Sequence, residues 1–266
     1  MREHIQNSKR IVVKVGTTTL AYPNGKLNLQ RIEKLTWVLS ALRNRGLDVV
    51  LVTSGAIAVG ADRLGLAERP RDICGKQAAS AVGQAALMQM YQSFFLSYGQ
   101  TVAQILLTKD VLENEVMREN ARNTFFTLFK LGVIPIVNEN DTVSVAELGF
   151  SFGENDLLSA YVACLVESDA LALLSDTNAI YDLGDPALHP EAKAVSFVSE
   201  ITPEIKRMAG GSGSKLGTGG MASKVEAAEM VTAQGIDMVV CSGKEPEILF
   251  DVLDGKEIGT FFLGRR

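Results

Sequence analysis

The chain has 266 residues, of which 47% are hydrophobic and 21% charged, so it can bury a large core and is not disordered. Its 26 Lys and Arg residues and 31 Asp and Glu residues give a net charge of −5, which argues against a general nucleic-acid or anionic-membrane binder. Three scattered cysteines and two distant histidines predict no disulfide framework and no protein metal site. Without an apolar signal region or membrane-length run, we expect a soluble protein of the reducing cytoplasm.

Hydrophobic periodicity predicts strands and helices that alternate along the chain. The expected strands cover residues 10–15, 48–53, 101–107, 133–137, 170–174, 237–241 and 259–263. The expected helices cover residues 28–45, 73–97, 117–131, 157–166, 202–208, 221–234 and 247–253. Residues 178–199 contain two prolines and are expected to be irregular. The alternation predicts one α/β domain, residues 1–266, with a mostly parallel sheet covered by helices on both faces.

Small polar residues follow several of the predicted strands. They occur in the segments 16–19, 54–57, 138–141 and 175–177. The carboxyl ends of parallel strands meet at one edge of a sheet, so these residues predict a site for a small polar or charged molecule. Lys14 lies inside a predicted core strand and would need an anionic partner there, unless it only extends from the strand end.

A second polar cluster, residues 153–156, opens the helix expected over 157–166. A helix N-terminus beside the strand ends favours a ligand site. The alternative is one turn followed by one N-cap, because Asn and Asp favour both positions. The closeness of this cluster to residues 138–141 favours a site.

The most glycine-rich segment, residues 210–220, precedes a helix whose first turn contains Lys224. Free backbone amides and the helix dipole would favour a phosphate there, although a flexible connection is the alternative. The chain has no GxxxxGK[ST] motif, so it is not a P-loop protein. A loose GxGxxA match at residues 217–222 lies far from the preceding strand, which gives little support to a dinucleotide site.

Six segments together resemble the glutamate 5-kinase branch of the amino acid kinase family, in the family's order and over nearly the whole chain. They are IVVKVGTT (11–18), VTSGAIAVG (52–60), GVIPIVNEND (132–141), FGENDLLSA (152–160), LLSDTNAIYD (173–182) and KLGTGGMASK (215–224). The resemblance implies an α/β/α sandwich with the amino acid kinase fold. It also implies a cytoplasmic transferase that uses ATP and Mg²⁺ to phosphorylate the γ-carboxylate of L-glutamate, the first step of proline biosynthesis.

The resemblance also implies residue roles. The catalytic residues would be Lys14, Lys224 and Asp156, with Asp156 holding the two lysines. Glutamate would be bound by the N-terminal part, through Ser54, Gly55, Ala56, Asn138, Asp141, Glu154 and Asn155. ATP would be bound mainly by the C-terminal part, through Lys14, Gly16, Thr17, Ser175, Asp176, Gly217, Thr218, Gly219, Gly220, Met221 and Lys224.

Two departures from the family pattern affect these expectations. Glu154 stands where the family usually has Asp, so the reach of that carboxylate differs. Many members carry a C-terminal PUA module, and this chain stops at Arg266 without one, either as a kinase-only form or as a shortened chain. The resemblance further implies feedback inhibition by proline. The weakly charged helix over 73–97 is expected to be either a core element or a subunit interface, and as an interface it predicts a homo-oligomer, a dimer or a tetramer.

Elementary chemistry agrees with carboxylate phosphorylation. A carboxylate acceptor is already deprotonated near pH 7, so no general base is required, and two lysines with Mg²⁺ offset the repulsion between two anionic substrates. Asp141 and Glu154 could pair with the substrate ammonium. Mg²⁺ can bind the ATP phosphates and needs no cage of protein acids.

Two alternatives stay open. An acetylglutamate, aspartate, uridylate or isopentenyl phosphate kinase would share the sheet and the lysines. The acids of segment 138–141 argue against acetylglutamate, whose blocked amine has no charge to pair. A non-catalytic ligand-binding member of the fold is the other alternative, and the joint presence of Lys14, Asp156 and Lys224 argues against it.

Overall fold

The computed structural model describes residues 2–22, 26–143, 155–183, 189–209 and 220–265. The strands are β1 (Arg10–Val15), β2 (Asp48–Val52), β3 (Val102–Leu107), β4 (Ile134–Glu139), β5 (Ala170–Ser175), β6 (Ile180–Tyr181), β7 (Ala194–Val195), β8 (Phe197–Val198), β9 (Asp237–Ser242) and β10 (Thr260–Phe262). The helices are the 3₁₀ turn η1 (Ile5–Asn7), α1 (Thr17–Leu20), α2 (Leu29–Asn44), α3 (Ala56–Arg63), α4 (Ile73–Ser97), α5 (Lys109–Glu113), α6 (Glu115–Lys130), α7 (Asn155–Leu165), α8 (Pro203–Ala209), α9 (Met221–Thr232) and α10 (Ile248–Leu253). None of the helices in these ranges combines the length and apolarity that a membrane crossing requires.

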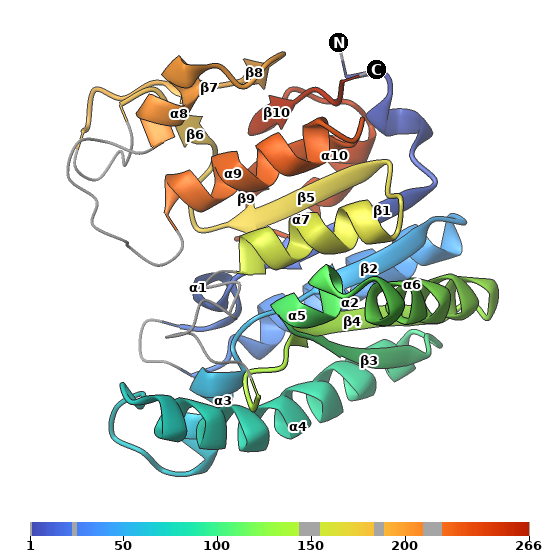
Figure 1. The fold of residues 1–266 in the computed structure, drawn as a ribbon, viewed down its shortest axis with the longest axis vertical. Helices are drawn as coiled ribbons and strands as arrows, with labels where there is room; N and C mark the ends of the chain where they lie inside the picture. Colours follow the sequence, from blue (N-terminus) through green and yellow to red (C-terminus); the bar gives the residue numbers. More distant parts are fainter. Residues whose placement is uncertain (1, 23–25, 144–154, 184–188, 210–219, 266) are drawn as a thin grey trace.

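Eight strands form one sheet in the order β3-β4-β2-β1-β5-β9-β10-β8 (Figure 1). Every neighbouring pair is parallel except β9 and β10, which confirms the predicted mostly parallel sheet. Strand β1 lies between β2 and β5, so the chain builds the sheet outward from β1 in both directions. Ligands of such sheets bind beyond the carboxyl ends of the strands at the point where the strand order reverses. The fold therefore places a candidate site beyond Val15.

The two faces of the sheet bury separate apolar cores, as expected for a sheet between two helical layers. Alternate residues of β1, namely Ile11, Val13 and Val15, pack with α2, α4 and α10. Val12 packs on the opposite face with α6, α7 and α9. Because side chains alternate along a strand, Lys14 shares the face of Val12 and points toward α7 and α9. Figure 1 shows these two helices side by side in front of β1 and β5.

Among the differences between the expected and the observed elements, three change the sheet or the edge where the candidate site lies. Strand β4 continues through Asn138 and Glu139, because their backbones pair with Leu106 and Leu107 of β3. The segment expected to be irregular contains β6, β7 and β8, and β8 forms an edge of the main sheet. The polar segment after β2 leads directly into α3, which the sequence analysis did not anticipate. Sheet pairing and tertiary packing override local polarity at these places.

Helices α3 and α4 approach each other closely because glycines face each other at their contact. A Cβ atom added at Gly60 would lie 1.7 Å from the carbonyl oxygen of Ala79, and one added at Gly83 would lie 1.8 Å from that of Ala56. Both contacts are with backbone atoms, so no side-chain movement could relieve them. This approach brings the polar face of α4 to the carboxyl ends of β2 and β4.

Gly83→Ala is therefore expected to lower the free energy of unfolding by about 1–3 kcal/mol, because the added methyl forces the two helices apart. Urea denaturation of wild type and variant measures the difference. Ser97→Ala, at the exposed end of the same helix, is the matched control. An equal effect of the two substitutions would show that the glycine contact does not constrain the packing.

Candidate active site

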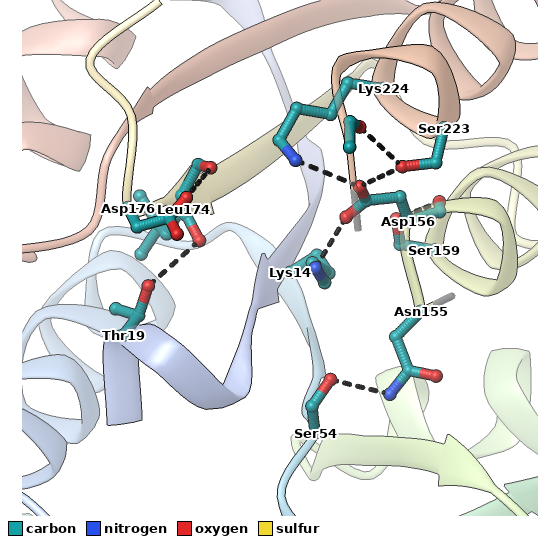
Figure 2. A network of polar contacts seen from close by, with 12 residues as sticks. Lys14, Thr19, Ser54, Asn155, Asp156, Ser159, Leu174, Asp176, Ser223 and Lys224 are labelled. Carbon is teal, nitrogen blue, oxygen red and sulfur yellow. Dashed lines mark hydrogen bonds and ion pairs between the residues drawn. The ribbon is translucent and has the colours of Figure 1, made fainter. Parts of the chain in front are cut away.

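Lys14, Asp156 and Lys224 form a buried ion-pair cluster (Figure 2). The Lys14 ammonium lies 2.5 Å from Oδ1 of Asp156, and the Lys224 ammonium lies 3.4 Å from Oδ2. The three residues come from β1, α9 and α7, which are far apart in sequence. The lysines are 8% and 6% exposed and the aspartate 1%, so the cluster is strongly shielded from water. One carboxylate thus positions two cations.

The local structure fixes the Asp156 carboxylate. Asp156 lies in the first turn of α7, and the Ser223 hydroxyl donates to its Oδ2 at 2.9 Å. Burial by itself would raise the pKa of Asp156, but the charges of Lys14 and Lys224 outweigh that effect and hold the pKa below its ordinary value. Asp156 is therefore ionised at neutral pH, as its role of pairing two lysines requires.

A cavity of about 660 Å³ opens beside this cluster at the carboxyl ends of the central strands. Most of the residues singled out in the sequence line it: Lys14, Gly16, Thr17, Ser54, Gly55, Ala56, Asn138, Asp141, Asn155, Ser175, Asp176 and Lys224. Asp156 lies behind the two lysines, and Gly220 and Met221 are the N-cap and first residue of α9. Glu154, Gly217, Thr218 and Gly219 lie outside the described residues.

The Asn155 side chain connects three strand and helix ends around this cavity. Its amide nitrogen donates to the carbonyl oxygen of Thr53 at 2.5 Å, to Ser54 Oγ at 2.9 Å and to Asn138 Oδ1 at 2.9 Å. Figure 2 shows Asn155 directed toward Ser54. Asn138 in turn donates to Gln84 of α4 at 2.8 Å. The chain of amides fixes the ends of β2, β4 and α7 against α4.

Asp141 supplies a partly buried carboxylate on the side of the cavity formed by β4 and α4. The Ser80 hydroxyl donates to its Oδ2 at 2.8 Å. Burial raises the pKa of the Asp141 carboxyl, the Ser80 hydrogen bond lowers it, and the nearby charge of Glu139 raises it further, so the pKa lies above its ordinary value. A cation bound beside Asp141 would relieve this unfavourable environment. The carboxylate is well suited to an ammonium group.

Two helices present N-termini at this site, and no side chain of the described residues caps either of them. Gly55 is the N-cap of α3 with a φ of 102°, a conformation that strongly favours glycine, and it leads into Ala56. Gly220 is the N-cap of α9, and Lys224 is in the first turn of that helix. The free backbone amides and helix dipoles favour anions. The cavity therefore combines positions for anions with one for a cation.

The sequence analysis did not select the polar residues of α4 for the site. Ser80 and Gln84 contact Asp141 and Asn138, while Lys76 and Gln77 line the cavity, as does Arg69 from the segment before the helix. A spacing of four residues from Lys76 to Ser80 and Gln84, within an Ala-rich helix, was the available signal. The weak charge of this helix predicts only a core or interface element.

No three His, Cys, Asp or Glu side chains among the described residues form a group that could hold a metal ion. Asp176 provides one exposed carboxylate at the cavity, with the Ser175 hydroxyl donating to it at 3.1 Å. This donor set fits Mg²⁺ that is bound mainly through the phosphates of a nucleotide, with water completing its shell.

Comparisons with known proteins agree with the fold and cover the whole chain. Residues 9–242 match the model of the amino acid kinase family. The glutamate 5-kinase of Clostridium perfringens is 53% identical over 100% of this chain and 99% of its own length. The enzyme of the same name from Listeria monocytogenes serovar 1/2a is 51% identical over 100% and 97% of the two chains, and that from Enterococcus faecalis is 48% identical over 99% and 97%.

Two solved structures share the fold at low sequence identity. UMP kinase from Bacillus anthracis has a TM-score of 0.63 at 18% identity, with 97% of each chain covered. Isopentenyl phosphate kinase from T. acidophilum has a TM-score of 0.63 at 17% identity, with 95% of this chain and 99% of that chain covered. These two likenesses concern the fold alone. The family match and the full-length relatives establish that the chain belongs to the amino acid kinase family.

Proposed function

We propose that this protein transfers the γ-phosphoryl group of ATP to the γ-carboxylate of L-glutamate and forms L-glutamyl 5-phosphate, the first step of proline biosynthesis. The observation that carries the proposal is the buried Lys14–Asp156–Lys224 cluster beside a cavity that offers both anion and cation positions. The full-length relatives named glutamate 5-kinase, 48–53% identical, support the choice of reaction.

The two lysines act on the moving phosphoryl group. Phosphoryl transfer depends on alignment of donor and acceptor and on neutralisation of charge, with little covalent help from the protein. Lys14 and Lys224 contact separate carboxylate oxygens of Asp156, which holds both lysines in place beside the cavity. The acceptor carboxylate is already ionised at neutral pH, so no residue has to remove a proton.

The cavity divides into two regions. The glutamate region consists of residues from the N-terminal part and the first turn of α7: Ser54, Gly55, Ala56, Asn138, Asp141 and Asn155, with Glu154 as a further candidate. Asp141 would pair with the α-ammonium group. The ATP region consists of Lys14, Gly16, Thr17, Ser175, Asp176 and Lys224. The segment from Gly217 to Met221 supplies further candidates for ATP binding. Both regions belong to one domain, because β1 and β5 are neighbours in one sheet.

Mg²⁺ bound to ATP would supply additional positive charge on the phosphates. Among the described residues of the ATP region, Asp176 has the acidic side chain that could contact the metal or its water shell. The protein would otherwise contribute lysines and backbone amides.

Two alternative functions, another kinase of the family and a non-catalytic binding protein, can be distinguished from the proposed one by testing which acceptors are phosphorylated. A different kinase of the family would accept N-acetyl-L-glutamate, L-aspartate, UMP or isopentenyl phosphate, and a non-catalytic binding protein would accept none of them. ADP release should be measured with each of these compounds and with L-glutamate, at equal concentrations with MgATP. We expect ADP release with L-glutamate that exceeds all others. Preference for another acceptor, or no turnover at all, would contradict the proposal.

Proline is expected to inhibit in competition with glutamate. Its ammonium and carboxylate groups match those of the glutamate α-carbon, so it can occupy the Asp141 end of the cavity. Initial rates at low and at saturating glutamate, with and without proline, measure this. We expect proline to lower the initial rate at low glutamate but not at saturating glutamate. An initial rate at low glutamate that proline leaves unchanged would contradict the expectation.

The protein is further expected to form a homo-oligomer, a dimer or a tetramer, through α4. This helix exposes Val82 and Leu96, at 40% and 70%. Sedimentation at micromolar concentration should show an oligomer, and Leu96→Asp should weaken it. Leu131→Asp, on an equally exposed residue after α6, is the control. A monomeric wild type would rule out the interface.

We also place the protein in the cytoplasm. Cys74, Cys164 and Cys241 are all free thiols. Burial raises the pKa of the Cys241 thiol to about 12, so this thiol is unreactive at neutral pH. Free thiols are the usual state in a reducing compartment.

A further inference from the structure

Ser80 of α4 is buried, at 2% exposure, and its hydroxyl group donates to the carboxylate that faces the cavity from the end of β4. We infer that Ser80 is a positioning residue: it holds the Asp141 carboxylate toward the substrate's ammonium group and so helps set how tightly an α-amino acid binds. This inference rests on the proposed function, in which Asp141 binds that ammonium.

The position of Ser80 is built into the fold. Gly83, one turn further along α4, touches the backbone of α3 so closely that a Cβ atom there would lie 2.5 Å from the Gly60 nitrogen. Gln84 fixes the same face of α4 to Asn138 at the end of β4. These contacts leave α4 little freedom to move relative to Asp141. The Ser80 hydrogen bond is therefore maintained by the packing of the helix.

Asp141 needs such a partner because it is three residues beyond Asn138, outside the paired part of β4. A carboxylate at the end of a strand has several rotamers, and only some of them face the cavity. A hydrogen bond from a fixed hydroxyl group selects among them and leaves the second carboxylate oxygen available for an ammonium group. The bond also stabilises the ionised form, which is the form that binds a cation.

The charged groups around Asp141 decide how its titration responds to Ser80. Within the described residues they are Glu139 of β4 and, around the same cavity, Lys14, Arg69, Lys76, Asp176 and Lys224. Burial and Glu139 raise the pKa of Asp141, whereas the Ser80 hydrogen bond lowers it. Removal of the hydroxyl group should therefore raise the pKa further. Glutamate binding requires ionised Asp141, so in a Ser80→Ala variant affinity should be lost at a higher pH than in wild type.

Ser80→Ala is expected to raise the KM for glutamate roughly tenfold, the loss typical of a hydrogen bond to a charged group. The value of kcat at saturating glutamate should change little, because the group acts on binding. The acid limb of the KM profile should shift to higher pH. Ser80→Cys has a similar volume but donates only a weak hydrogen bond, so its KM for glutamate should lie between those of wild type and Ser80→Ala. Ser93→Ala, on the exposed side of the same helix, is the matched control and should match wild type.

A double-mutant cycle with Asp141→Asn separates positioning from a general effect on the fold. If Ser80 acts through Asp141, Ser80→Ala should change the KM of the Asp141→Asn enzyme by no more than about twofold. Wild type that releases no ADP with glutamate would refute the proposed function itself. An active wild type whose KM and pH profile are unaltered by both Ser80 substitutions would overturn the inference alone. So would a full-sized Ser80→Ala effect in the Asp141→Asn background.

Discussion

Lys224→Ala and Lys14→Ala are each expected to lower kcat by about 10²–10³-fold, with a much smaller change in the KM for glutamate. Both ammonium groups lie on Asp156 at the place where the phosphoryl group would pass. An interaction that is made mainly in the transition state lowers kcat and kcat/KM together when it is removed. Steady-state kinetics with glutamate and ATP varied in turn measure both parameters.

The controls separate lost chemistry from lost structure. Lys224→Met and Lys14→Met keep most of the aliphatic stem and should give the same fall in kcat. Lys256→Ala breaks an exposed ion pair with Asp251 and should leave both parameters unchanged. Thermal unfolding identifies variants in which Asp156, left with one lysine and the Ser223 hydroxyl, destabilises the fold. A folded variant with near-normal kcat would refute the catalytic role of that lysine.

The second large effect concerns substrate specificity, because Asp141 is expected to bind the α-ammonium group of glutamate. The wild type should phosphorylate L-glutamate and strongly reject N-acetyl-L-glutamate, because the acetyl group removes the positive charge and leaves a partly buried carboxylate unpaired. The loss of one partner from such a pair costs roughly 2–5 kcal/mol. L-aspartate should also be poor, since its side chain is one methylene shorter and a misplacement of about 1 Å can cost on the order of 10²-fold in rate.

Asp141→Asn should raise the KM for glutamate. It should also reduce the preference for glutamate over N-acetyl-L-glutamate, because the neutral Asn side chain leaves no unpaired charge when the substrate lacks an ammonium group. The ratio of kcat/KM for the two substrates, in wild type and variant, measures the effect. Asp176→Asn, an acid on the ATP side of the cavity, is the control and should keep the preference for glutamate. A preference that survives Asp141→Asn unchanged would assign ammonium recognition to another residue.

The layer architecture could be predicted from the sequence because its signals are local. Residues 10–15 form an apolar run interrupted by Lys14, and β1 has these bounds. The run 73–97 forms α4 with the bounds that its composition predicted, and Asp72 caps it through the backbone amide of Gly75. Alternation along β1 also accounts for the side of the sheet on which Lys14 finds its carboxylate.

The parts that could not be predicted depend on contacts between distant segments. The polarity of Asn138 and Glu139 predicts a loop, and only their pairing with β3 makes them part of a strand. The sequence does not distinguish Ser80 and Gln84 from other polar residues of a helix. The close packing of α3 on α4 through Gly60 and Gly83 brings them to the site. Spacing within α4 places Ser80 and Gln84 on one face of the helix, but it does not identify the segments that this face contacts.

Hydroxylamine trapping of the wild-type product tests the central claim most directly. An acyl phosphate reacts with hydroxylamine to give a hydroxamate, whereas a phosphate ester or an unmodified amino acid gives none under the same conditions. With L-glutamate, MgATP and hydroxylamine, we expect γ-glutamyl hydroxamate to accumulate in proportion to ADP. ADP release without hydroxamate, or hydroxamate formed from N-acetyl-L-glutamate at an equal rate, would contradict the assignment of this cavity to the γ-carboxylate of glutamate.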